Sequence, residues 1–546
     1  MPSAHVNVVI VGAGAAGGVA AKELAVAGLT VVLLERGRWQ NFDDHDHDEL
    51  ISQRVTVLGN AFGPDDERHP RVRGVGDQWK TVRPSEPGYS NNAACVGGGT
   101  LSYGGMAWRF MPQDFRMRST YGCPDGSTLD DWPITYDDLE PYYEKAEWDI
   151  GVSGDESDPY AEPRRKPYPM PPFAYNLEAR LLKPAAERLG FHPFPIPMTR
   201  NSVPRDGRAA CIGCRSCVGF ACEVHAKGGT QNTVIPTAMA TGRCEVRTEC
   251  VAREILLDPK GRATGVSYHD PSGRLQTQTA DVVIVAASAI ESARLLLLSR
   301  SPLHPKGLGN RHDWVGRNLQ GHGYAGAWGL FEQDVYDDVG AGATIAICDF
   351  NHGNQGLRGG GMLANEFIRL PYLFSGIRPA GAPQWGLKHK VFQRQYFRRS
   401  MNVIGPVQEM PVFECRVELD PTVKDAWGIP VARLSGRRHP HDIEIGQFLA
   451  TKAEAWLKEA GATQTWRRVP GTGVSGGQHQ AGTCRMGNDP KTSVVDGSYR
   501  IHDVENVYVI DGSVHVTNGG FNPVLTIMAN AYRASAGIVK ALGSKG

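Results

Sequence analysis

The sequence predicts a mixed α/β fold (α+β over the whole chain), with a parallel sheet in one domain and an antiparallel sheet in a second. Asn7–Val11 is a β-branched run that a glycine-rich turn joins to a helical pattern. A further strand-sized apolar run occupies Val282–Ile290. Alternation of apolar and polar residues in Met410–Leu419 and Val431–Leu434 is typical of antiparallel strands, which we expect to form a second sheet.

The bulk composition is that of a globular protein and excludes several classes of function. The 546 residues suffice for two domains and a large core. The formal net charge is zero, so no basic excess indicates binding to nucleic acid or to an anionic membrane. The longest apolar runs are strand-sized and the N-terminus has no signal-peptide pattern. We therefore expect no transmembrane segment and a cytoplasmic location, unless a partner subunit carries the chain across a membrane.

The first strand, turn and helix form a dinucleotide-binding fingerprint. Gly12, Gly14 and Gly17 have the spacing of G-x-G-x-x-G, which lets a pyrophosphate approach the N-terminus of the helix. A second strand, Thr30–Leu34, ends at Glu35, where a carboxylate can accept hydrogen bonds from ribose hydroxyls and disfavours the 2′-phosphate of NADP. This order of elements predicts a Rossmann-like domain and leaves FAD and NAD both open.

His479 and Asn522 are the candidate catalytic residues. A neutral imidazole can take a proton from an alcohol near neutral pH, because an unperturbed histidine titrates at about pH 6.5. An amide beside it can hold the alcohol oxygen without competing for that proton. Each residue also has a plainer interpretation, His479 as a core histidine and Asn522 as the cap of a helix with Pro523 in its first turn.

Four blocks of sequence resemble the glucose–methanol–choline (GMC) flavoprotein oxidoreductases, and together they extend over nearly the whole chain. They are the fingerprint, the glycine-rich CVGGGTLSYGGMAWR (Cys95–Arg109), the segment VVIVAASAIESARLLLLSR (Val282–Arg300), and the C-terminal segment with His479 and Asn522. Within the family, the chain is most similar to bacterial sugar and polyol dehydrogenases of the gluconate 2-dehydrogenase type, and to pyranose and glycoside oxidases.

The resemblance implies FAD as the cofactor, and we expect the antiparallel strands in Met410–Leu419 and Val431–Leu434 to form a sheet over it. Some members tether the flavin through a histidine in the glycine-rich loop, and Ser102 stands at that position, so we expect non-covalent FAD. Besides the fingerprint, the flavin contacts that we predict are Gly98, Gly99, Thr100, Ser102, Val251, Asp511, Gly512 and Pro523.

The resemblance also implies a reaction. We expect a dehydrogenase that oxidises a secondary hydroxyl of a sugar, polyol or glycoside, with hydride transfer to flavin N5 and His479 as the base. An oxidase that uses O₂ and releases H₂O₂ is the alternative, and a non-redox lyase that retains FAD is an alternative from another class. The expected partners are a small carbohydrate or alcohol, with either an electron-transfer protein or a second copy of the chain.

The resemblance further implies that each domain is assembled from separate stretches. The FAD-binding domain is expected to comprise residues 1–129, 202–321 and 469–546. The substrate-binding domain is expected to comprise residues 130–201 and 322–468.

Four of the eleven cysteines lie within twelve residues. Cys211, Cys214, Cys217 and Cys222 have the spacing C-x2-C-x2-C-x4-C, which approaches that of ferredoxins but lacks the final proline. An iron–sulfur cluster, a zinc site, disulfides and uncoordinated thiols all remain open, although zinc ligands are usually separated by a longer loop. The odd cysteine total argues against the disulfide framework of a secreted protein.

Three lesser features remain, and the first two of them have two interpretations each. The Asp- and His-rich stretch Asn41–Leu50 is more typical of a solvated loop than of a divalent-cation site. Tyr103, Trp108 and Phe521 offer faces on which a sugar could stack, or pack in the core. His515 is expected near the flavin or substrate, without an assigned role.

Overall fold

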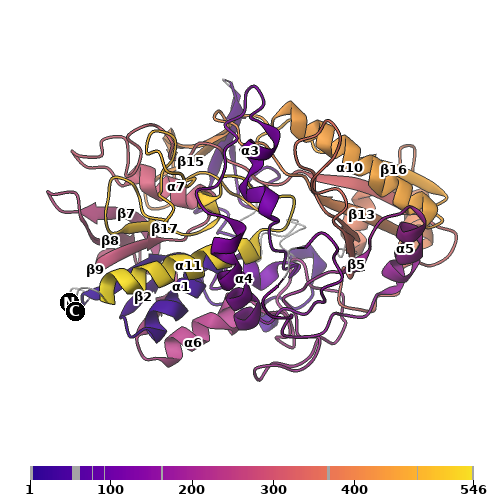
Figure 1. The fold of residues 1–546 in the computed structure, drawn as a ribbon, viewed down its shortest axis with the longest axis horizontal. Coiled ribbons are helices and arrows are strands. Elements are labelled where there is room, and N and C mark those ends of the chain that lie inside the picture. The colour runs from indigo at the N-terminus through magenta and orange to yellow at the C-terminus, as the bar shows by residue number, and fades with distance from the viewer. Residues whose placement is uncertain are drawn as a thin grey trace.

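The computed structural model describes residues 4–51, 62–76, 78–90, 93–161, 164–365, 369–475 and 477–543, and it confirms the mixed α/β fold (Figure 1). In this part of the chain the strands form sheets of seven, six and four strands.

The seven-stranded sheet contains the predicted dinucleotide-binding fingerprint. Its order is β6-β2-β1-β9-β8-β7, with β17 paired to β9. The strands are β1 (Val6–Val11), β2 (Val31–Leu34), β6 (Cys244–Arg247), β7 (Val251–Leu257), β8 (Ala263–His269), β9 (Leu275–Val285) and β17 (Val507–Val509). Because β6, β2, β1, β9 and β17 run parallel, their carboxyl ends meet at one edge, where ligands bind in open α/β sheets.

Helices pack on both faces of this sheet (Figure 1). Helix α1 (Ala15–Val26) packs against α11 (Val524–Gly543), and α11 packs in turn against α4 (Tyr136–Ile150). Helix α4 begins with a capping box, in which Thr135 Oγ1 accepts from the Asp138 amide at 3.2 Å and the Asp138 carboxylate accepts from the Thr135 amide at 2.8 Å. Helix α6 (Val234–Ala240) packs against α1 on the same side, whereas α7 (Ala289–Leu298) packs against β7 on the opposite face of the sheet (Figure 1).

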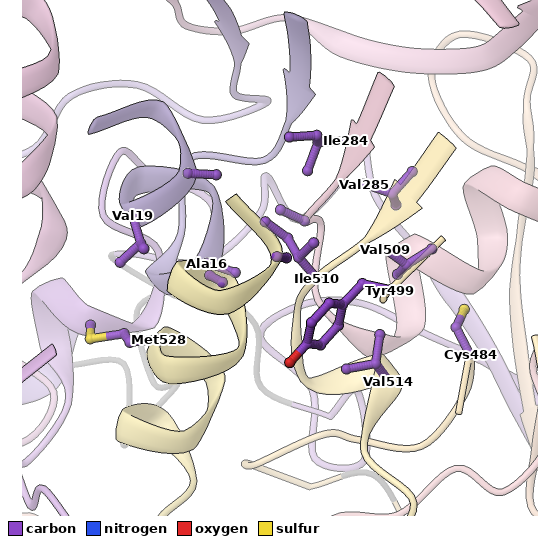
Figure 2. Packing of buried hydrophobic residues seen from close by; sticks show 14 of the residues in the cluster. Ala16, Val19, Ile284, Val285, Cys484, Tyr499, Val509, Ile510, Val514 and Met528 are labelled. Atoms are coloured by element: carbon purple, nitrogen blue, oxygen red, sulfur yellow. The ribbon is translucent and has the colours of Figure 1, made fainter. Parts of the chain in front are cut away.

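The core between these helices and the sheet consists of small and β-branched side chains. Figure 2 shows Ala16 and Val19 of α1, Ile284 and Val285 of β9, and Met528 of α11 in one buried cluster. Burying each of the larger side chains stabilises the fold by about 1.5–3 kcal/mol. This packing holds the first turn of α1 and the end of β9 in fixed positions beside each other.

The six-stranded sheet, of order β16-β10-β13-β12-β11-β5, is antiparallel. Its strands are β5 (Phe194–Pro195), β10 (Tyr324–Leu330), β11 (Ile345–Ile347), β12 (Leu363–Asn365), β13 (Ser400–Pro406) and β16 (Gln464–Arg468). Helices α10 (Pro440–Glu459) and α5 (Leu177–Arg188) cover one of its faces (Figure 1). The other face contributes to the cavity described below.

The four-stranded sheet has the order β14-β15-β3-β4 and corrects one expectation. Its strands are β3 (Arg71–Val75), β4 (Gln78–Val82), β14 (Arg416–Lys424) and β15 (Pro430–Ser435). The predicted antiparallel pair β14–β15 is present. The prediction that these two strands lie over the cofactor is wrong, because the cavity is lined by the six-stranded sheet instead.

The four-stranded sheet also joins stretches that were assigned to different domains. β3 belongs to the stretch 1–129 and pairs in parallel with β15 of the stretch 322–468. The two domain boundaries stay a prediction.

The remaining helices are short. They are α2 (Gly99–Ser102), α3 (Met117–Tyr121), α8 (Pro371–Gly376) and α9 (Gly386–Tyr396). In the described ranges, no helix combines the length and the apolar character needed to cross a bilayer.

Candidate functional site

A cavity of about 830 Å³ unites the fingerprint with the candidate catalytic pair. Gly12 and Glu35 line it, and so do His479 and Asn522. The other predicted flavin contacts on its wall are Gly14, Gly98, Gly99, Thr100, Ser102, Val251, Asp511, Gly512 and Pro523. The structure therefore brings together residues that lie more than 500 positions apart in the sequence.

Two glycines of the fingerprint are required by close packing of the backbone. Gly12 has φ +104°, and a Cβ there would lie 2.4 Å from the carbonyl oxygen of Ala286. Gly17 does not line the cavity, and a Cβ on it would lie 1.8 Å from the carbonyl oxygen of Gly12. Gly17 thus serves the contact between helix and strand, as the fingerprint predicts.

Glu35 stands at the carboxyl end of β2, beside the turn. Its carboxylate accepts from the backbone amides of Ala13 and Gly37, each at 2.9 Å. Burial raises the pKa of this carboxyl, and the two amide donors oppose that rise. The carboxylate is consequently held in one orientation on the cavity wall.

Asp511 follows β17 and connects two segments. One of its oxygens accepts from the Ser288 amide at 2.9 Å and from the Ser292 hydroxyl at 2.6 Å, and the other accepts from the Ser513 amide at 2.9 Å. Burial raises its pKa. Its carboxylate thus ties the start of α7 to the C-terminal segment on the wall of the cavity.

The two candidate catalytic residues are in contact. Asn522 Nδ2 lies 3.4 Å from His479 Nε2 and 3.2 Å from the hydroxyl of Tyr324. Asn522 Oδ1 accepts from Trp108 Nε1 at 3.2 Å. The prediction that Asn522 caps α11 is wrong, because the first helical hydrogen bond, from Ile527, goes to the carbonyl of Pro523.

His322 is a site residue that sequence reasoning missed. Its Nδ1 lies 2.9 Å from Nδ1 of His479, and its Nε2 lies 3.0 Å from the carbonyl oxygen of Gly519. The side chain is 4% exposed, and burial lowers its pKa to about 4. His322 stands in the glycine-rich segment NLQGHGYAG. This segment has no regular spacing of apolar residues from which the burial of His322 could be predicted.

A buried ion pair flanks His322. Glu409 accepts from the amides of Gly321 at 3.1 Å and Gly323 at 2.7 Å, and it also pairs with Arg438 and with the hydroxyl of Ser475. Burial raises the pKa of Glu409, but Arg438 and Ser475 outweigh it and hold the pKa below its ordinary value. The backbone on both sides of His322 is thereby fixed.

Of the three candidate stacking residues, Tyr103 lines the cavity, whereas Trp108 and Phe521 pack in the core. The Tyr103 hydroxyl bonds to Thr199 and to the carbonyl of Gly228. Trp108 and Phe521 are buried and do not line the cavity, and their rings pack together with centroids 5.5 Å apart. The structure therefore supports core packing over sugar stacking for these two.

His515 lies behind the catalytic pair. It is fully buried, and burial lowers its pKa to about 4. Its Nδ1 lies 3.1 Å from Asn518 Oδ1, and Asn518 Nδ2 donates to the carbonyl oxygen of His479 at 2.8 Å. His515 does not line the cavity, so the expectation that it lies beside the cofactor or substrate is replaced by a supporting position.

The four clustered cysteines carry no metal-binding geometry. Among the described residues, no group of three or more His, Cys, Asp or Glu is placed to hold a metal ion. The Cys217 thiol instead accepts from Arg200 Nη1 at 2.8 Å. Burial raises the pKa of Cys217, but the charges of Arg200 and Lys227 outweigh it and lower the pKa overall. An iron–sulfur cluster on Cys211, Cys214, Cys217 and Cys222 stays a prediction without support here.

The Asp- and His-rich stretch folds onto aromatic residues. The ring of His45 packs against Phe62 at 4.9 Å between centroids, and that of His47 against Phe220 at 5.4 Å. Its acids and histidines form no metal-binding group in the described ranges.

Two family models match the chain, and both are described as GMC oxidoreductase. One matches residues 8–324 and the other matches residues 411–531. The 2-methyl-1,2-propanediol dehydrogenase of Mycolicibacterium austroafricanum is 32% identical over 97% of this chain and 94% of its own length. The 6'''-hydroxyparomomycin C oxidase of Streptomyces lividus is 32% identical over 98% and 92%. The gluconate 2-dehydrogenase flavoprotein of Pantoea cypripedii is 29% identical over 98% and 93%.

Solved structures show the same fold at low identity. A pyridoxine 4-oxidase from Mesorbium loti superimposes with a TM-score of 0.62 at 17% identity, over 97% of this chain and 98% of that one. A formate oxidase of Aspergillus oryzae with the mutation R554A gives a TM-score of 0.66 at 15% identity, over the full length of both chains.

Proposed function

The chain belongs to the GMC oxidoreductase family, and on this premise we propose that it is an FAD-dependent dehydrogenase of a sugar, polyol or glycoside. The single observation that carries the proposal is the contact between His479 and Asn522 on the wall of the cavity that the dinucleotide fingerprint also lines. Oxidation of an alcohol requires a base that takes the hydroxyl proton and a group that holds the hydroxyl oxygen. The imidazole and the amide can serve as these two groups.

The cavity wall fits the cofactor that the family implies. Gly14 and Gly99 line it, and a Cβ on either would meet no protein atom within 4 Å, so bare backbone faces open space. Ser288 Oγ on the same wall is buried without a hydrogen-bond partner in the described part of the chain. Glu35 and Asp511 supply fixed carboxylates for hydroxyl groups. Bound here, FAD would supply the two-electron acceptor for hydride.

The residues of the chain handle the substrate oxygen and its proton. We propose that Asn522 Nδ2 and the Tyr324 hydroxyl hold the alcohol oxygen, because they lie 3.2 Å apart on the cavity wall. His479 Nε2, beside the same amide, takes the hydroxyl proton as the C–H bond breaks. Ala364 and Ile404 of the six-stranded sheet cover the site together with Met362, which directly precedes β12, and these apolar side chains exclude water.

The names of the relatives support the substrate class, and they are compatible with two kinds of electron acceptor. Their names include a gluconate 2-dehydrogenase flavoprotein and a fructose dehydrogenase large subunit, and also a paromamine 6'-oxidase. We propose a dehydrogenase that passes electrons to a carrier or partner subunit, with an oxidase as the second candidate. Release of H₂O₂ during turnover in air would identify the oxidase, and reduction of an artificial dye without H₂O₂ would identify the dehydrogenase.

An anaerobic screen of sugars, polyols and glycosides for bleaching of the bound flavin tests the proposal. At least one of them is expected to bleach the flavin, and failure with every alcohol would overturn it. The base is tested with His479→Asn, since His479 has φ +65° and asparagine tolerates this backbone region. Flavin reduction should slow by about 10²–10⁴-fold while FAD stays bound. His225→Asn, at an exposed histidine with φ +55°, is the matched control.

A further inference from the structure

We propose that His322 is a positioning residue that fixes the tautomer of His479, so that Nδ1 carries the proton and Nε2 is the basic atom in the cavity. The inference rests on the proposed function, since it concerns the same base. It is carried by a chain of hydrogen bonds whose two ends have only one possible direction.

The first end is the carbonyl of Gly519. A carbonyl oxygen only accepts, so His322 Nε2, 3.0 Å away, must carry a hydrogen. In a neutral imidazole the other nitrogen is then an acceptor, and that nitrogen is Nδ1. His479 Nδ1, 2.9 Å from it, is therefore the donor, which leaves His479 Nε2 without a proton.

The second end is the indole of Trp108, and it gives the same answer independently. An indole N–H only donates, so the atom of Asn522 that faces it at 3.2 Å must be Oδ1. The NH₂ group of Asn522 is then directed at His479 Nε2, at 3.4 Å. An NH₂ group only donates, so His479 Nε2 must be the unprotonated nitrogen.

The surroundings keep His322 neutral, so its Nδ1 can accept a hydrogen bond from His479 when His479 becomes protonated. The side chain is 4% exposed, and its burial lowers the pKa to about 4. The charged and titratable groups that face it are Glu409 and Arg438, which pair with each other, and His515, which is itself buried. When His479 gains the substrate proton, its bond to His322 becomes charge-assisted, and such bonds are about twice as strong as neutral ones.

Three substitutions at His322 test this role. His322→Leu removes the acceptor, and we expect flavin reduction to slow by about 10–100-fold, as for other residues that orient a reacting group, with FAD content unchanged. His322→Gln should restore most of the rate, because its amide oxygen can accept from His479 while its NH₂ group donates to Gly519. His322→Asn is one methylene too short to span both partners and should resemble the leucine variant. His441→Leu, at another buried histidine, controls for the burial of leucine.

The pH dependence of the flavin-reduction rate distinguishes a positioning role of His322 from a general loss of structure in the variants. Without His322 the protonated form of His479 loses its acceptor, so the acid-side midpoint of the flavin-reduction rate should move to lower pH in His322→Leu and stay in place in His322→Gln. Equal rates and midpoints in wild type and His322→Leu would overturn the inference. If His322→Leu does not fold, the comparison of the other two variants takes its place. A rate of flavin reduction in His322→Gln that is no higher than in His322→Asn would also overturn the inference.

The same measurements distinguish this inference from the proposed function. If no sugar, polyol or glycoside bleaches the flavin of the wild type, the proposed function fails. If His479→Asn reduces its flavin at the wild-type rate, His479 is not the base, and the positioning role of His322 fails with that assignment. If His479→Asn is slow and His322→Leu is not, only the positioning role fails.

Discussion

Trp108 Nε1 donates to Asn522 Oδ1 over 3.2 Å, and this bond joins residues 414 positions apart in the sequence. The two ends of an asparagine amide have nearly the same shape, so packing alone does not select between them. The indole does select, because it can only donate. It turns the NH₂ group of Asn522 toward His479 and the hydroxyl of Tyr324.

Trp108→Phe should therefore impair the catalytic pair while leaving the fold intact. Phenylalanine keeps an aromatic ring in the core but removes the N–H, so the amide of Asn522 loses its fixed orientation. We expect flavin reduction to slow by about 10–100-fold, with the FAD content unchanged. Stopped-flow measurement of anaerobic flavin reduction checks this.

Trp132→Phe is the control for that experiment. Trp132 is equally buried and donates to Thr517 Oγ1 at 2.9 Å, but it has no contact with Asn522. The control should lose stability without a comparable loss of rate. Equal rates in the two variants would show that the indole N–H of Trp108 does not act on the catalytic pair.

Gly99→Ala should weaken FAD binding without weakening the apoprotein. A Cβ at Gly99 meets no protein atom within 4 Å and would occupy the open space of the cavity. Alanine at a helical position without steric conflict stabilises a protein by about 0.4–1 kcal/mol. We expect a lower ratio of flavin to protein absorbance after purification, with the melting temperature of the apoprotein unchanged or raised.

Gly537→Ala is the matched control for the cofactor site. Gly537 lies exposed within α11, and a Cβ there also meets no atom within 4 Å. This variant should keep its full flavin content. An equal flavin content in both variants would contradict the placement of FAD against Gly99.

The local elements of the site were predictable from the sequence, because their signals are local. The turn after β1, the acid that follows β2 and the segment around Asp511 each stand in a short sequence pattern, whereas His479 also had the plainer interpretation of a core histidine. Glu35 and Asp511 occupy the cavity wall where those patterns put them.

The cover of the cavity and the partner of the base were not predictable in this way. β10 and β13 are buried along nearly their whole length, so they show no alternation of apolar and polar residues. In β14, Val417 is buried between two half-buried polar neighbours, so the sequence alternates there, and this alternation led to the wrong prediction of which strands cover the cavity. His322 meets His479 only through tertiary structure, 157 residues away.

Acid precipitation should release the flavin into solution. Ser102 lies on the cavity wall at the position from which related proteins are expected to tether the cofactor through histidine. A serine hydroxyl is not the imidazole on which that linkage depends, so no bond should survive unfolding. Yellow colour and flavin fluorescence are expected in the supernatant. Flavin that stays in the pellet after washing would show a covalent link through another residue.

Glu409→Gln should lower stability most at neutral pH and least in acid. Glu409 is 2% exposed, and Arg438 and Ser475 hold its folded-state pKa below the ordinary value of 4.5. A depressed folded-state pKa stabilises the fold above the unfolded-state value, and this contribution is lost as the pH falls through the folded-state value. Loss of one partner from a buried ion pair costs about 3–5 kcal/mol.

The pH dependence of unfolding provides the measurement for this pair. Urea unfolding at pH 7 should show the full difference between wild type and Glu409→Gln, and the difference should shrink as the pH falls below 4.5, the ordinary value for this carboxyl. Glu418→Gln removes a carboxylate from a partly exposed pair with Arg416 and Arg433, where the expected cost is only about 0–1 kcal/mol. A difference for Glu409→Gln that persists unchanged into acid would mean that the charge of Glu409 is not what stabilises the segment around His322.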